Sequence, residues 1–155
     1  MWILQSRFLF DAIRMVETGG HPDPANAIGD GGLSLGPYQI TEAYWKDAIQ
    51  HHPEIGGRYE DVKKLAYAER IMSAYWDRYS PDDHAETLAR IHNGGPRGHR
   101  RSSTDAYWLR VRKAMDSSNL RRDRERVGSE PRGRQENPRT SHQKAATGVA
   151  ARSNR

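Results

Sequence analysis

Apolar residues recur every three or four positions near the start of the chain. This spacing predicts an amphipathic helix over residues 3–16, which would bury one broad apolar stripe. The pair Gly19 and Gly20 is expected to end the helix, because glycine readily takes the backbone conformation that follows a last helical turn. Glu17 would then lie in that last turn, where helices more often carry Lys or Arg.

The next stretch has no helical period. Its prolines and Asx residues predict a turn segment over residues 21–27. The Gly-Asp-Gly-Gly run at 29–32 is a hairpin signal, so we expect one small, tightly bent β-hairpin over residues 28–40. This hairpin would carry Asp30 on an open, glycine-rich loop.

Helical patterns return after the hairpin, and four further helices are predicted. Their expected ranges are 41–50 with Thr41 as the N-cap, 59–79 with a wide aromatic-rich stripe, 81–93, and 104–115 with Thr104 as the N-cap. Five helices and one hairpin make an α+β domain that is mainly helical.

The pattern ends near residue 116, and the composition changes there. Residues 117–155 hold 10 of the 25 Lys+Arg and 4 of the 20 Asp+Glu, which gives a net charge of +6 and leaves −1 on residues 1–116. The mean hydropathy of −0.98 is low for a chain that is folded throughout. We therefore expect one domain over 1–116 and a basic, disordered tail over 117–155.

Composition also limits the chemistry. The chain has no cysteine, which excludes disulfides and thiolate metal sites. His51 and His52 have no third ligand at a useful spacing in the sequence, so we expect no metal and no other cofactor. No signal peptide and no membrane span is readable in the sequence.

Two isolated acids, Glu17 and Asp30, flank the turn segment and suggest a pair of carboxylates facing one cleft. Hydrolysis of a glycosidic bond needs one protonated acid and one ionised carboxylate. We expect Glu17 to be partly shielded, which would raise its pKa and suit it to the role of acid. Asp30 should stay ionised on its open loop, as nucleophile or electrostatic stabiliser. The alternatives are a solvated surface role for Glu17 and an Asx-turn role for Asp30.

Two longer runs carry a family resemblance. GDGGLSLGPYQITEAYWKDA at 29–48 and ARIHNGGPRGHRRSSTDAYWLRV at 89–111 resemble the invertebrate-type (destabilase-like) lysozyme family, in order and spacing. The similarity covers residues 11–115. Animal members are usually rich in disulfides, so this chain is similar to the cysteine-free bacterial-type relatives. Its acidic loop is also shorter, and pairing Asp30 with the family's catalytic aspartate needs a gap.

The resemblance implies a lysozyme-like fold that cleaves the β-1,4 bond between N-acetylmuramic acid and N-acetylglucosamine, with Glu17 and Asp30 as catalytic residues. It also implies contacts with the sugars. The expected substrate-binding residues are Ser34, Tyr38, Gln39, His92 and Asn93. For Tyr38 the alternative is packing in the core, and for His92 and Asn93 it is a role in ending a helix.

Two other functions stay open at this point. A lytic transglycosylase would use Glu17 alone, since Glu-Thr-Gly-Gly followed by a Gly-x-x-Gln-Ile-type run also resembles that family. A cell-wall-binding domain would use the same cleft without catalysis.

The expected partner is the glycan strand of peptidoglycan, which places the site of action outside the cytoplasm even though no export signal is visible. The basic tail would attract polyanions without specificity. Its arginines lack the interleaved aromatic residues of a specific nucleic-acid site.

Overall fold

The computed structural model describes residues 2–128, except for the side chains of residues 2–6, 30, 123 and 125–128. Most of the tail predicted over 117–155 therefore lies outside the described residues. The described part is mainly helical and carries one small antiparallel sheet, in agreement with the α+β class expected from the sequence.

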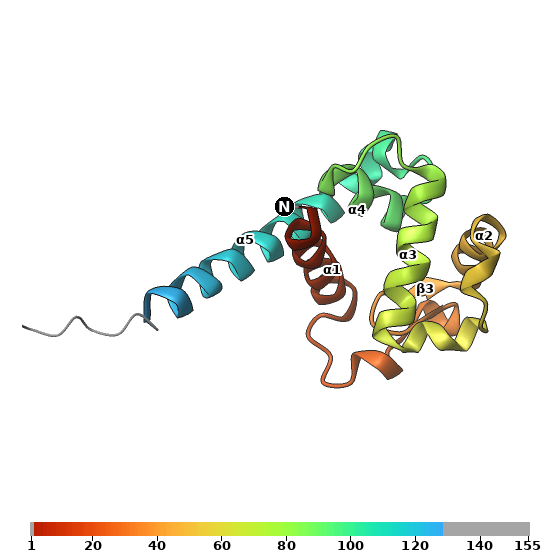
Figure 1. Ribbon diagram of the computed structural model, residues 1–155, viewed down its shortest axis with the longest axis horizontal. Coiled ribbons are helices and arrows are strands. Elements are labelled where there is room, and N and C mark those ends of the chain that lie inside the picture. Colours follow the sequence, from red (N-terminus) through yellow and green to blue (C-terminus); the bar gives the residue numbers. More distant parts are fainter. Residues whose placement is uncertain (1, 129–155) are drawn as a thin grey trace, which may run out of the picture.

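Five α-helices form the body. They are α1 (Trp2–Thr18), α2 (Glu42–His51), α3 (Leu65–Tyr79), α4 (Ala85–Gly94) and α5 (Asp105–Gly128). α3 packs against both α2 and α4, while α1 lies along the first part of α5, whose far end extends beyond the body (Figure 1). The expected cap of α2 is confirmed, because the Thr41 hydroxyl accepts a hydrogen bond from the Tyr44 N–H at 3.3 Å.

The sheet has one strand more than the predicted hairpin. Strands β1 (Ile28–Gly29), β2 (Ser34–Leu35) and β3 (Ile40–Thr41) pair antiparallel in the order β1-β2-β3. A second tight turn between β2 and β3 supplies the extra strand. Gly36 and Gln39 both take positive φ in this turn, at 77° and 49°, and reverse the chain within four residues.

Short 3-10 helices fill the connections. They are η1 (Pro24–Asn26), η2 (Asp30–Gly32), η3 (Pro53–Ile55), η4 (Tyr59–Lys63), η5 (Gly98–Arg100) and η6 (Ser102–Thr104). The helix predicted over 59–79 is divided, because Lys64 is extended between η4 and α3. Side-chain bonds of Asp61 to the Arg58 N–H and to Lys64 Nζ close η4 as a separate turn. The helix predicted from residue 81 begins later, at Ala85, because Asp82 accepts a bond from the His84 N–H and holds a turn.

The last helix also departs from the prediction. α5 does not end near Met115 but continues to Gly128, so residues 117–128 are helical rather than part of a tail. This stretch contains good helix formers and has no glycine or proline before Gly128, and the Arg122 guanidinium lies 4.6 Å from the centre of the Phe8 ring on α1. Thr104 precedes α5, but its buried hydroxyl binds Arg90 Nε and the carbonyls of Gly98 and Arg101.

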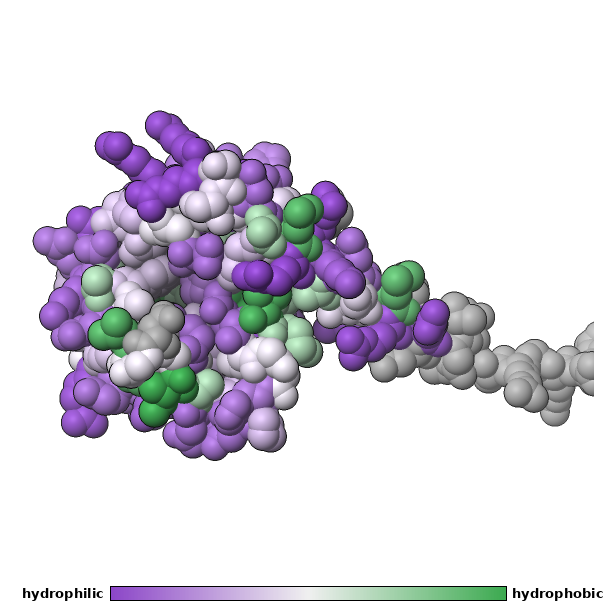
Figure 2. Space-filling view, turned by 180° about the vertical axis from the view of Figure 1, so that it is seen from behind, coloured by the Kyte–Doolittle hydropathy of each residue, from purple (hydrophilic) through white to green (hydrophobic). Residues whose placement is uncertain are grey.

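One hydrophobic core joins the helices to the sheet. Its largest fully buried side chains come from α1, the sheet region, η4, α3, α4 and α5: Ile13, Tyr38, Ile40, Val62, Ile71, Met72, Ile91 and Val111. On the face seen in Figure 2, hydrophilic side chains predominate and apolar ones gather in a few small patches. Within residues 2–128, no helix combines the length and the apolar character that crossing a membrane requires.

Candidate active site

A cleft of about 620 Å³ opens between the end of α1, the sheet, α2 and the end of α4. Five residues predicted from the sequence line it, namely Glu17, Ser34, Gln39, His92 and Asn93. A larger groove of about 1370 Å³ follows α3 and contains none of the residues predicted for catalysis. The smaller cleft is therefore the candidate active site, on the strength of its side chains rather than its size.

Glu17 lies on the cleft wall in the last turn of α1. The helix stops directly after it, where Gly19 takes a φ of 56° and donates its N–H to the Met15 carbonyl at 3.0 Å. The Glu17 side chain keeps only 18% of its surface exposed. Tyr107 donates its hydroxyl to Glu17 Oε1 at 2.6 Å, and His92 Nε2 lies 3.5 Å from the same oxygen. The shielding expected from the sequence is thus present.

His92 connects the acid to the floor of the cleft. Its Nε2 lies 3.1 Å from the Tyr38 carbonyl oxygen, and its Nδ1 lies 3.5 Å from the Tyr44 hydroxyl. A carbonyl oxygen can only accept, so Nε2 carries a proton and is a donor toward both the Tyr38 carbonyl and Glu17. Burial, together with the nearby Tyr75 and the Glu17 carboxylate, raises the pKa of Tyr44 well above its ordinary value. The Tyr44 hydroxyl therefore stays protonated beside His92.

The pKa of Glu17 differs from the expectation. Burial alone would raise it, but the hydrogen bond and charge of His92, the Tyr107 hydroxyl and the charge of Arg110 together outweigh burial. The pKa therefore lies below the ordinary value for a glutamate. The sequence-based expectation of a raised pKa was wrong because it counted the shielding and not the donors that accompany it.

Ser34 and Gln39 form the floor of the cleft mainly by bonding to one another. The Ser34 hydroxyl donates to Gln39 Oε1 at 3.1 Å, and Gln39 Nε2 donates to the carbonyls of Ala27 and Gly36 at 3.2 and 2.9 Å. Gln39 lies so close to β1 that a Cβ at Gly29 would collide with its amide oxygen. These two side chains hold the sheet in shape. Ser34 is buried, with 2% of its surface exposed, while Gln39 keeps part of its surface open where it lines the cleft.

Asn93 is exposed at the end of α4 and lines the cleft, and its contact with substrate stays a prediction. Tyr38 is placed differently. Its side chain is fully buried and donates its hydroxyl to Glu69 at 2.8 Å, so the predicted substrate contact is corrected to the alternative, core packing. Only the backbone carbonyl of Tyr38 serves the site, through His92.

Asp30 begins the short helix η2, but its side chain lies outside the described residues. Its pairing with Glu17 therefore stays a prediction.

Comparison with known proteins agrees with this geometry. Residues 14–114, about two thirds of the chain, match the protein-family model described as Destabilase. The chain belongs to the Destabilase family. Its fold and family are thus those that the sequence resemblance implied.

Several relatives of this Destabilase-family chain are named lysozymes. Lysozyme 1 of Crassostrea virginica is 42% identical over 83 residues, which cover 50% of this chain and 43% of the relative. Invertebrate-type lysozyme 3 of Caenorhabditis elegans is 32% identical over 117 residues, covering 68% of this chain and 84% of the relative. The crystal structure of Tapes japonica lysozyme superposes with a TM-score of 0.60 at 27% identity, over 69% of this chain and 88% of that one. The chain thus spans less than half of the Crassostrea protein and most of the other two.

The Destabilase-family cleft also contains residues that sequence reasoning missed. Tyr107, on α5, lies 90 positions from Glu17, to whose carboxyl it donates. Asp47, on α2, lines the cleft and accepts a bond from the Tyr79 hydroxyl at 3.0 Å. Tyr75 lines the cleft beside Tyr44, and their rings are stacked with centroids 3.6 Å apart. Local sequence gives no signal for such pairings, since each joins two distant elements.

Proposed function

We propose that this protein is a peptidoglycan hydrolase of the lysozyme type. It would cleave the β-1,4 bond between N-acetylmuramic acid and N-acetylglucosamine, with Glu17 as the general acid. The observation that carries the proposal is the position of the Glu17 carboxyl, shielded on the wall of a cleft and held there by Tyr107 and His92. Among the described residues both contacts are made to Oε1. Oε2 would then be the atom that gives its proton to the glycosidic oxygen.

Glu17 must carry a proton when the bond breaks, although its pKa is low in the free protein. A glycan strand in the cleft would displace water from around the carboxyl, and this desolvation raises the pKa. Binding of the sugar therefore favours the protonated form of Glu17, and the leaving oxygen then takes this proton.

The oxocarbenium-like centre needs a second, ionised carboxylate. We assign this role to Asp30, on the loop that borders the cleft. Asp47 is the other candidate, since it lines the cleft, but its carboxylate is already held by Tyr79. Hydrolysis by Asp30→Asn and Asp47→Asn separates the two. The assignment requires that Asp30→Asn lose most of the activity and that Asp47→Asn keep most of it.

Mass spectrometry of the soluble products from purified peptidoglycan tests the proposal. The wild type should release glycans with ordinary reducing ends, and Glu17→Gln should release almost none, because the amide cannot donate the proton. Products with anhydro ends that disappear in Glu17→Gln would instead make the protein a transglycosylase. Binding of peptidoglycan without release by either protein would indicate the non-catalytic wall-binding domain.

A further inference from the structure

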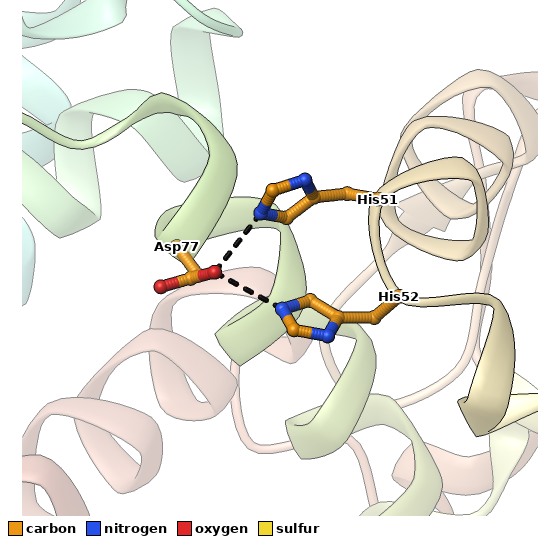
Figure 3. A group of neighbouring side chains, drawn as sticks. All are labelled: His51, His52 and Asp77. Atoms are coloured by element: carbon orange, nitrogen blue, oxygen red, sulfur yellow. Dashed lines mark hydrogen bonds and ion pairs between the residues drawn. The ribbon is translucent and has the colours of Figure 1, made fainter.

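Three polar side chains converge at the C-terminal end of α2, the end opposite β3. The Nε2 atoms of His51 and His52 lie 2.9 and 3.0 Å from the same oxygen, Oδ2 of Asp77 on α3. The three potential ligand atoms all lie within 4.8 Å of one another. Figure 3 shows both rings pointing at this one oxygen, from the end of α2 and the start of the following turn. None of the three residues lines the catalytic cleft.

The backbone explains how two consecutive histidines reach one point. Adjacent residues within a helix point in different directions and do not meet. His51 is the last residue of α2, whereas His52 is its C-cap with φ −125° and ψ 73°, outside the helical region. Pro53 favours this change, because a residue before proline is pushed out of the helical conformation. The His-His-Pro sequence thus folds the second ring back beside the first, with centroids 4.7 Å apart and planes at 79°.

The Glu54 carboxylate contacts the ring nitrogen of His52 that does not face Asp77. Glu54 Oε1 lies 2.7 Å from His52 Nδ1. Histidines that bind metals usually donate their other ring nitrogen to a carboxylate, which fixes the tautomer and leaves Nε2 free to bind the ion. The groove that contains His52 is also lined by Asp77, Asp82 and Asp83, whose negative charge attracts cations.

We propose that His51, His52 and Asp77 bind a divalent transition-metal ion of the zinc class. Two imidazoles and a carboxylate are ligands that Zn²⁺ prefers, at about 2.0–2.2 Å from the ion. Ligand atoms at such distances around a tetrahedral ion are a little over 3 Å apart, which is close to the 2.9 and 3.0 Å that separate the two imidazole nitrogens from Asp77 Oδ2. All three side chains are at least one third exposed, which leaves a fourth position open to water.

The bound ion would clamp the end of α2 to α3. Exposed ion pairs contribute little to stability, but a shared metal ligates both helices at once. The two helices also supply Tyr44, Asp47 and Tyr75 to the catalytic cleft. The metal would therefore stabilise the wall of that cleft without taking part in the chemistry. Reasoning from the sequence predicted no metal, because Asp77 is 25 positions away from His52.

Isothermal titration of the tag-free, EDTA-treated full chain with ZnCl₂ tests the site. We expect one strongly bound Zn²⁺ per chain and a rise in Tm on its addition, whereas Mg²⁺ and Ca²⁺, which prefer oxygen ligands, should give neither. His51→Gln and Asp77→Ala should each abolish this binding. Glu54→Gln, which keeps all three ligands, should weaken it about 10- to 100-fold.

His84→Gln is the matched control, since His84 is an exposed histidine of the same groove outside the cluster. This variant should bind Zn²⁺ as the wild type does. Circular dichroism of each metal-free variant checks that its fold is intact. If Asp77→Ala fails to fold, the Zn²⁺ affinities of Glu54→Gln and His51→Gln still test whether the cluster binds the ion. The proposal is overturned if the wild type binds no Zn²⁺, or if the cluster variants bind it as tightly as His84→Gln does.

Discussion

Glu17 meets two opposite requirements within one side chain. In the free protein its partners favour the carboxylate, while in the proposed reaction it must hold a proton. The donors around it therefore set the pH range in which the protein can work. They also predict how this range moves when one donor is removed.

Tyr107→Phe should shift the alkaline limb of the pH profile upward. The change removes the hydroxyl that donates to Glu17 Oε1 at 2.6 Å, so the carboxylate loses stabilisation and its pKa rises. A general acid loses activity as the pH rises through its pKa. The limb of kcat/KM should therefore move up by about one pH unit, the size that a net hydrogen bond to a charged group implies.

Tyr67→Phe is the matched control for this change. The Tyr67 hydroxyl is also an internal donor, to the Gly56 carbonyl at 2.6 Å, but the residue does not line the cleft. Its pH profile should superpose on that of the wild type. An alkaline limb that moves in neither variant, or equally in both, would contradict the role assigned to Tyr107.

Glu17 should also make the folded state sensitive to acid. A carboxyl whose pKa is lower in the folded protein than in the unfolded chain stabilises the fold above its ordinary value of 4.5. This contribution is lost as the pH falls below 4.5 and the folded group takes up its proton. Glu17→Gln lacks the ionisation, so its free energy of unfolding, measured by urea denaturation, should fall less between pH 5 and about pH 3. Parallel curves for the two proteins would argue against a lowered pKa.

Among the secondary-structure elements, the small sheet keeps its shape because the Gln39 side-chain amide packs closely against Gly29 of β1. Gly29 has extended backbone angles that any residue can adopt, and its need for glycine comes from the Gln39 amide packed over it. Gly29→Ala should push Gln39 out of place, lower stability by about 1–3 kcal/mol as overpacking does, and reduce lytic activity further by deforming the cleft floor. Thermal unfolding and peptidoglycan release measure the two effects.

Gly56→Ala provides the comparison for that variant. A Cβ at Gly56 meets open space, but its backbone angles, φ 59° and ψ −158°, disfavour any side chain, at a cost of about 1–3 kcal/mol. The residue lies outside the cleft, so activity at a temperature where the fold is intact should be unchanged. Equal loss of activity in both variants would mean that stability alone, and not the position of Gln39, controls the cleft.

Local and long-range features differ in how well the sequence predicted them. The end of α1 at Gly19, the Thr41 cap and the bend at 28–40 follow from residues within a few positions of one another, and the structure has all three. The Tyr107 contact with Glu17 and the approach of Asp77 to His51 each join two helices, so no spacing in the sequence reveals them.

The boundary of the last helix was missed for another physical reason. Residues 117–128 have few apolar positions, so their pattern was interpreted as a tail, yet their helix propensity continues α5 to Gly128.

At the scale of the whole molecule, charge is divided between two parts of the chain. Residues 129–155 hold 6 of the 25 Lys+Arg and 2 of the 20 Asp+Glu, a net charge of +4, which leaves +1 on residues 1–128. Peptidoglycan sacculi and nucleic acids both carry anionic groups. The C-terminal residues should therefore increase binding to either polymer through screened, nonspecific attraction, while in the proposed function the cleft determines which bond is cut.

A salt series on the full chain and on a chain that ends at Gly128 tests this division. For DNA, the slope of log K against log[salt] should be smaller in the shortened chain by at most about 5, since six basic residues are removed. Binding to sacculi should weaken with salt in the same way, and cleavage of a short, uncharged oligosaccharide should be equal in the two proteins. A preference for one DNA sequence that persists at high salt would instead require base contacts, which mere attraction to phosphates does not supply. Equal salt slopes would place the binding surface within residues 1–128.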